Sequence, residues 1–165
     1  MERKFDLKDI VLIGRTYDEY YHMFGLSDLD PAAEKILDAA SGVSSFCAEA
    51  NEKGYDVTAS DRIYGLSPEE IREKCAADLV TVMDKLSGLT DRYRWTYFTD
   101  MEALKVQRER AYRGFVMDYA AHRERYVETN YPRSAFRDKQ FTVSLASGFL
   151  FLYDEHLDYD FHRVR

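Results

Sequence analysis

The residues best suited to bind a ligand lie in a stretch of small side chains between two acids. Asp38 ends one short apolar segment, and Asp61 ends another, nineteen positions after Gly42. The small residues that follow Asp38 are Ala39, Ala40, Ser41 and Gly42. Such a turn lets a ligand approach the backbone closely and presents the N–H groups of a helix N-terminus to it. Because a carboxylate at position 61 can accept both hydroxyls of a ribose, the pair predicts an adenosine-type site.

The elements that would position this site form a βαβ unit. Residues 35–40 read as a short apolar strand, and residues 44–53 as a helix with Ser44 or Ser45 as N-cap. Gly54 is a plausible stop for the helix, and residues 55–60 read as a second strand that ends at Asp61. This order predicts two parallel strands joined by a right-handed crossover, the unit of doubly wound sheets.

Asp38 indicates which adenosine cofactor the turn would hold. An acid at the end of the first strand repels a pyrophosphate, but it binds the ammonium of an amino acid directly or through water. This favours S-adenosylmethionine (SAM) over NAD or FAD. A nicotinamide enzyme is the least favoured alternative, because its pyrophosphate would lie beside Asp38.

With these motifs the chain resembles the class I SAM-dependent methyltransferases, whose first motif is an apolar strand, an acid and GxGxG. Asp38 matches the acid and Gly42 the central glycine, while Ala40 and Ser44 replace the outer glycines. The segments GRTYDEYYHMF, GVSSF and FLFLYDEHLDYDFH are similar to a bacterial subgroup of that family. The resemblance implies a cofactor site, whose further members are Asp61 and Arg62 on the ribose side and Glu128 on the adenine side.

The resemblance also implies roles at the two ends of the chain. Residues 1–30 form a lead-in with a helix at 16–26, and Arg15 and Tyr20 would close over the methionine end of the cofactor. Packing of an aromatic stripe is at least as good an interpretation of that helix. Ser147, after the fourth strand, lies where the family lines its transfer site, and it is the one candidate catalytic residue. At Gly148 the subgroup has a histidine.

The resemblance predicts a single α/β domain over residues 1–165, with a Rossmann-like, partly parallel sheet in the strand order 3-2-1-4. After the βαβ unit at 31–61 comes a long helical cap insertion at 62–125. Its helices are predicted to start at Ser67, in a capping box with Glu70, and near residue 99. Strands at 126–129 and 141–153 complete a methyltransferase fold that is truncated, since the family has further strands.

The expected activity is methyl transfer from SAM to an unidentified, small-molecule acceptor, in which the enzyme aligns acceptor and methyl group in a dry site. The alternative is a non-catalytic module that forms a homodimer through the open edge of its fourth strand. The degenerate glycines and missing strands favour the module, and the intact Asp38 and Asp61 favour the enzyme.

Three further groups of residues have competing interpretations. The aromatics at 93–98 suit an acceptor pocket, but core packing under the inserted helices is favoured. The basic residues of 99–123 suit a phosphate-bearing substrate, but interleaved acids favour an ion-paired, solvated face. The acids and histidines at 154–162 resemble a metal cluster, but acids at a helix start are ordinary, so no metal site is predicted.

Composition limits the partners that we expect. The chain has 23 Lys+Arg against 30 Asp+Glu, a net charge of -7, which argues against a general nucleic-acid binder and against an acidic membrane surface. Cys47 and Cys75 form no CxxC pair and read as small core residues. The chain shows no secretory signal and no apolar run near the roughly 20 residues of a membrane span. The predicted location is a reducing cytoplasm.

Overall fold

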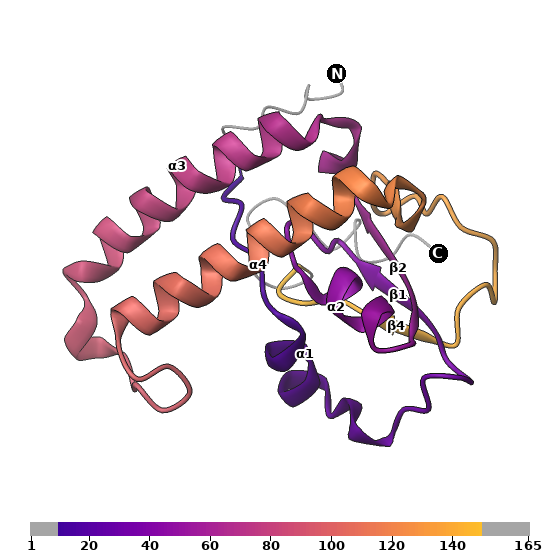
Figure 1. Ribbon diagram of the computed structural model, residues 1–165, viewed down its shortest axis with the longest axis horizontal. Coiled ribbons are helices and arrows are strands. Elements are labelled where there is room, and N and C mark those ends of the chain that lie inside the picture. The colour runs from indigo at the N-terminus through magenta and orange to yellow at the C-terminus, as the bar shows by residue number, and fades with distance from the viewer. Residues whose placement is uncertain (1–9, 150–165) are drawn as a thin grey trace.

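A computed structural model describes residues 10–149 of the chain. The described residues form an α/β structure with four strands and four α-helices (Figure 1). In chain order these elements are α1 (Tyr17–Phe24), β1 (Lys35–Ala39), α2 (Phe46–Glu52), β2 (Asp56–Asp61), α3 (Pro68–Ser87), α4 (Met101–Ala121), β3 (Tyr126–Glu128) and β4 (Val143–Leu145). The predicted α/β class and the predicted order of elements are confirmed.

The strand order is β3-β2-β1-β4, as predicted, and all three pairings are parallel. The sheet of the described residues is therefore wholly parallel rather than partly parallel, since the antiparallel strand of the expected fold has no counterpart among them. The fourth strand is shorter than predicted. Val143–Leu145 pairs with β1, whereas the predicted strand ran from 141 to 153, and part of that range lies outside the described residues.

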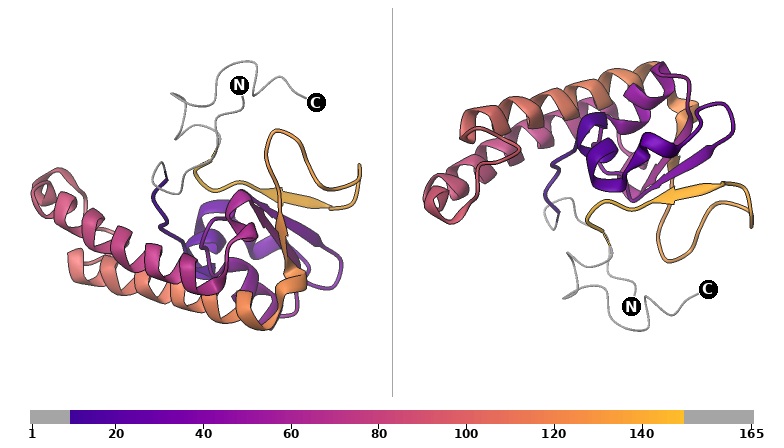
Figure 2. Two further views of the ribbon diagram at one scale, coloured as in Figure 1. Left: turned by 90° about the horizontal axis from the view of Figure 1, so that it is seen from above. Right: turned by 90° about the horizontal axis from the view of Figure 1, so that it is seen from below.

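The described helices lie on one side of the sheet (Figure 2). Alternation of side chains along the strands turns Ile36, Val57 and Ala59 into the core beneath them. On this side α2 contacts both β2 and α4, and α1 contacts α2. The first helix is capped by Thr16 and by Gly25, which is in the left-handed conformation, and its aromatic residues Tyr17 and Tyr20 pack in the core, which confirms the aromatic stripe.

The insertion between β2 and β3 is an antiparallel hairpin of α3 and α4 (Figure 1). Ser67 and Glu70 form the predicted capping box at the start of α3, and Asp100 caps α4. Only one end of the hairpin is part of the core, where α4 contributes Phe115 and Tyr119. The other end, residues 80–107, contains no buried residue and extends beyond the sheet.

Several smaller expectations can be compared with the structure. Both cysteines are buried, as predicted. Asp30 and Pro31 start a single turn, after which the chain extends at Lys35 to join the sheet. Within residues 10–149 no helix is long and apolar enough to cross a membrane, and no cluster of possible metal ligands occurs. The acids and histidines at 154–162 lie outside the described residues.

A close backbone contact joins the N-terminal segment to the first turn. A Cβ placed on Gly14 would lie 2.1 Å from the carbonyl oxygen of Val43 and 2.9 Å from the backbone nitrogen of Ser44. Both neighbours are backbone atoms, which have no rotamer through which to move away. Residue 14 therefore has to be glycine for the N-terminal segment to lie against the turn.

We predict that Gly14→Ala destabilises the protein by about 3 kcal/mol, because the added methyl group forces backbone to move. Urea denaturation of the variant and the wild type measures the difference. Gly88→Ala is the matched control: it has an ordinary φ of -80° and nothing within 4 Å of its Cβ position, so its stability should be unchanged or slightly higher. Equal stability of the two variants would contradict the assigned close contact.

Candidate functional site

The turn that follows β1 has two residues in the left-handed conformation. Ala40 has a φ of 51° and Gly42 a φ of 57°. Alanine at such an angle costs about 1 kcal/mol or more, so the surrounding structure must hold it there. A Cβ at Gly42 would meet nothing within 4 Å, which means that the backbone faces open space at this point. The backbone of the turn is thus strained at Ala40 and accessible at Gly42. The small residues predicted this accessibility.

Asp61, at the end of β2, holds the first turn through backbone hydrogen bonds. Its Oδ2 accepts from the Gly42 N–H at 2.9 Å and its Oδ1 from the Ile63 N–H at 3.1 Å. The Tyr64 hydroxyl donates to the carbonyl of Gly42 at 2.8 Å. Burial raises the pKa of Asp61 above its ordinary value, against the lowering effect of the two backbone donors. Each carboxylate oxygen retains a further lone pair for another donor.

Asp38 is fully buried at the centre of the site. Its Oδ1 accepts from the Tyr20 hydroxyl at 3.0 Å and its Oδ2 from the Ser41 hydroxyl at 2.6 Å. Burial, with a smaller contribution from the charge of Asp61, raises the pKa of Asp38 to about 7 although both hydroxyls lower it. Both oxygens of the carboxylate are therefore engaged by hydroxyl groups of the protein.

Ser147 supplies a hydroxyl without a partner beside this cluster. Its Oγ is buried and makes no hydrogen bond with any residue that the structure describes. It lies close enough to Tyr20 to lower the pKa of that phenol, which burial raises well above its ordinary value. An unpaired buried hydroxyl costs free energy, so it calls for an explanation. Ser147, the candidate catalytic residue, thus lies beside Tyr20, whose hydroxyl binds Asp38.

The remaining predicted residues lie around the same edge of the sheet. The carbonyl of Arg15 accepts from the Ser45 N–H and from the Ser44 hydroxyl, so the lead-in segment contacts the first turn through backbone. Glu128 pairs with Asp61 across β2 and β3, and its carboxyl group packs against Gly65. Arg62 follows Asp61 directly and lowers its pKa.

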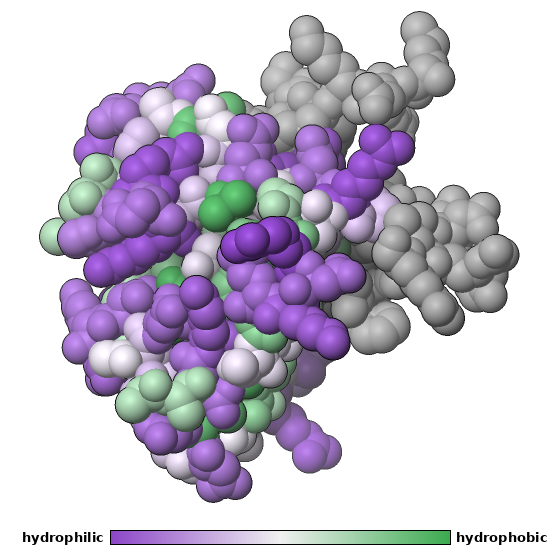
Figure 3. All heavy atoms as spheres, turned by 90° about the vertical axis from the view of Figure 1, so that its right-hand side faces the viewer, coloured by the Kyte–Doolittle hydropathy of each residue, from purple (hydrophilic) through white to green (hydrophobic). Residues whose placement is uncertain are grey.

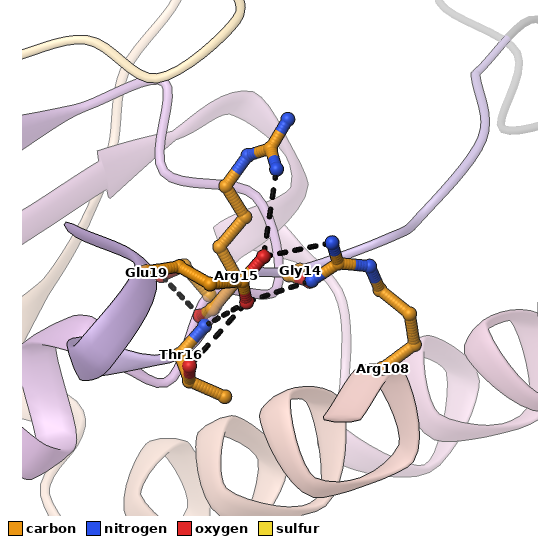
Figure 4. A network of polar contacts seen from close by, with 6 residues as sticks. Gly14, Arg15, Thr16, Glu19 and Arg108 are labelled. Atoms are coloured by element: carbon orange, nitrogen blue, oxygen red, sulfur yellow. Dashed lines mark hydrogen bonds and ion pairs between the residues drawn. The ribbon is translucent and has the colours of Figure 1, made fainter. Parts of the chain in front are cut away.

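A buried ion pair fixes the lead-in segment to the inserted hairpin (Figure 4). The guanidinium of Arg108 on α4 binds both carboxylate oxygens of Glu19 at 2.8 Å and donates to the carbonyl of Gly14 at 3.0 Å. Glu19 also accepts from the Thr16 N–H at 2.9 Å and forms a longer ion pair with Arg15 at 3.6 Å. Although burial raises the pKa of Glu19, Arg108 more than offsets this, and the net pKa is lowered.

Several residues that shape the site were not predicted from the sequence. Tyr64, Tyr131, Gly14 and Arg108 come from distant segments, and nothing near the turn indicates them. Tyr131, for example, shares a 2.7 Å hydrogen bond with Ser60 on β2. The capping role of Glu19 could have been predicted, because Glu19 stands three residues after Thr16 in a capping-box pattern. The structure forms that capping box.

The basic face of α4 is only in part what was predicted. Arg110 forms an exposed ion pair with Glu49, as an ion-paired, solvated face predicts. Arg108 is buried, which corrects that prediction, because its partner Glu19 lies on α1 beneath the helix. Neither arrangement requires a phosphate-bearing substrate.

Together the fold and the site define an α/β protein whose polar cluster lies at the carboxyl ends of parallel strands. Comparison with known proteins adds a relative: the chain is 49% identical to the "Uncharacterized protein MJ0045" of Methanocaldococcus jannaschii over 162 residues. The match covers 98% of this chain and 73% of the relative. The chain belongs to the same family as this archaeal protein. No protein-family description and no solved structure matches the chain.

We predict that stability falls by about 3 kcal/mol between pH 5 and pH 8 because of Asp38. Its pKa is raised from about 3.9 in the unfolded chain to about 7, so the folded state binds the proton more tightly. The stabilisation is present when the carboxyl group is protonated and is lost as the pH rises toward 7. Asp38→Asn should flatten this dependence in urea titrations. Asp56→Asn, which removes an exposed carboxyl group at the start of β2, should keep the wild-type slope.

We predict that Arg108→Met costs about 3 kcal/mol at pH 7, because it leaves the charge of Glu19 buried without its partner. The difference from the wild type should shrink as the pH falls, because burial without Arg108 raises the pKa of Glu19 and the carboxyl group of the folded variant therefore takes up a proton first. Arg110→Met is the matched control, since it breaks an exposed pair worth at most about 1 kcal/mol. Denaturation curves in which both variants lose equally would contradict a structural role for the buried pair.

Proposed function

We propose that this protein binds SAM at the carboxyl edge of its sheet and transfers the methyl group to an acceptor. The strand order β3-β2-β1-β4 indicates where a ligand would bind. The chain moves outward from β1 to β3 and then returns to the other side of β1, so the order reverses between β1 and β4. Ligands of open α/β sheets bind outside the carboxyl ends of the strands at such a reversal.

The single observation that carries the proposal is the convergence of polar groups at that reversal. Asp38 lies near the end of β1, Ser147 follows β4, and Tyr20 from α1 lies between them. Among residues 10–149 the Ser147 hydroxyl has no hydrogen-bond partner, as expected of a group that a site keeps for a polar ligand. A structural core position would instead hold alanine or valine.

The residues present suit SAM with one change to the expected contacts: Asp38 would act on the ammonium through hydroxyl groups. Asp61, with lone pairs to spare, would receive the ribose hydroxyls, and the Gly42 turn would lie beside the adenosine. The methionine end would meet the hydroxyls of Tyr20, Ser41 and Ser147, and Asp38 would act on its ammonium through the first two. When bound, the cofactor supplies an electrophilic methyl group, so the protein has only to align the acceptor and exclude water.

The non-catalytic alternative has one observation in its favour. Both carboxylates that would bind the cofactor are already engaged by groups of the protein, Asp38 by two hydroxyls and Asp61 by two backbone N–H groups. In that case the site would be a structural polar cluster. The strained Ala40 and the unpaired Ser147 argue against this interpretation, because a purely structural cluster has no reason to keep either.

Ser147→Ala separates the two interpretations. Removing a buried, unpaired hydroxyl should leave the free energy of unfolding unchanged or raise it by about 1 kcal/mol. If the hydroxyl contacts the cofactor, calorimetric titration with SAM and S-adenosylhomocysteine should show a dissociation constant about 5 to 10 times higher than that of the wild type. Ser134→Ala, at an exposed loop position, is the matched control and should bind as the wild type does.

A second variant tests the ribose contact. Asp61→Asn keeps an oxygen for one of the two backbone donors, whereas Asp61→Ala would release the whole turn. We expect Asp61→Asn to weaken SAM binding at least tenfold while the protein remains folded by circular dichroism. A folded wild-type protein that binds neither compound would refute the cofactor site and leave the structural interpretation.

A further inference from the structure

The outer end of the α3–α4 hairpin presents an aromatic groove that the proposed cofactor site does not use. The groove has a volume of about 240 Å³. Its apolar walls are Leu86, Tyr93, Trp95, Tyr97, Phe98 and Leu104. These aromatics were predicted to pack in the core under the inserted helices. That prediction is wrong, because the segment lies at the tip of the hairpin, where no residue between 80 and 107 is buried.

Two of the four rings at the tip are exposed, while Trp95 and Phe98 are half-buried. Tyr93 is 48% exposed and Tyr97 is 50% exposed. Trp95 lies between them in the sequence, tilted against the ring of Tyr93 at 6.1 Å, and its indole N–H donates to the carbonyl of Thr90. Exposed aromatic rings do not occur over the whole surface. The face at the opposite end of the molecule from the hairpin tip is mostly hydrophilic (Figure 3).

Positive charge accompanies these rings. Arg92 and Arg94 alternate with Tyr93 and Trp95 in the sequence, and Arg94 also lines the groove. Both arginines are exposed, and within residues 10–149 neither forms an ion pair, in contrast to Arg108 and Arg110 of the same hairpin. The tip therefore offers flat aromatic faces for stacking beside guanidinium groups that have no anionic partner.

We propose that the hairpin tip binds single-stranded nucleic acid, with bases stacked on Tyr93 and Trp95 and phosphates bound by Arg92 and Arg94. Single-stranded nucleic acid has flat bases and a negatively charged backbone. An aromatic groove complements the bases by stacking, and the unpaired arginines beside it complement the charge. An apolar peptide would match the rings but not the arginines. The proposal does not depend on SAM binding, because the tip and the cofactor site share no residue.

The acidic balance of the whole chain sets the strength of this interaction. A net charge of -7 repels a polyanion everywhere except at a local basic surface, so the site engages few phosphates. Two arginines that each neutralise one phosphate of a single strand give a slope of about -1.4 when the logarithm of the binding constant is plotted against that of the salt concentration. This is a local site, not the general nucleic-acid binding that the composition excludes.

Trp95 is the single tryptophan of the chain, so its fluorescence reports on the groove directly. The experiment titrates the full-length protein with a single-stranded RNA oligonucleotide at salt concentrations between about 30 and 200 mM. We expect quenching with a slope of about -1.4, and a slope of about -0.7 for Arg94→Ala. Tyr93→Ala should lower the affinity at least fivefold with an unchanged slope, since stacking carries no ionic contribution.

Arg113→Ala is the matched control, because it removes an exposed arginine from the same hairpin at a distance from the groove. Its affinity and slope should equal those of the wild type. Absence of quenching would overturn the proposal, and so would an Arg94→Ala slope equal to that of the wild type. A fluorescence change that follows protein concentration without RNA would also overturn it, since a second copy of the chain would then occupy the groove.

Discussion

The buried contact of Arg108 with Glu19 and Gly14 determines where the N-terminal segment lies, and the site follows from that position. One guanidinium joins α4 to the start of α1 and to the backbone that precedes it. Gly14 then lies against the backbone at Val43, at a distance that excludes any Cβ. Once this segment is fixed, α1 places Tyr20 on Asp38. The inserted hairpin, far from the turn in sequence, thereby helps to build the turn's surroundings.

The energetics of Asp38 indicate that this arrangement is not optimised for stability alone. Burial without a positive partner opposes ionisation of the carboxyl group near neutral pH, and two hydroxyls offset this only in part. Ala40 in the left-handed conformation and the unpaired Ser147 hydroxyl add further costs within the same few residues. Costs of this kind concentrate at functional sites, where selection retains them against stability.

The sequence predicted those parts of the site whose positions follow from the local pattern and from the parallel arrangement of the strands. The small residues after Asp38 indicated the turn, and the acid after the second apolar segment indicated its neighbour, because parallel strands end at the same edge. Tyr64 and Arg108 escaped prediction for a physical reason: each reaches the site from an element whose packing the local pattern does not specify. The exposure of the aromatics at 93–98 escaped it too, since apolar content alone does not distinguish a core segment from a hairpin tip.

The length of the hairpin separates two roles within one insertion. A 21-residue helix spans about 30 Å, yet every buried residue of α4 lies at or after Arg108. On α3 the last buried residue is Leu79. The half of the hairpin near the sheet supplies Tyr119 and Phe115 to the core, so changes there disturb the fold. The outer half contributes no buried side chain, and Tyr93 and Trp95 pack only locally, against each other and, through the Trp95 N–H, on the carbonyl of Thr90. Large aromatic side chains kept where folding does not require them are best explained by what they contact outside the chain.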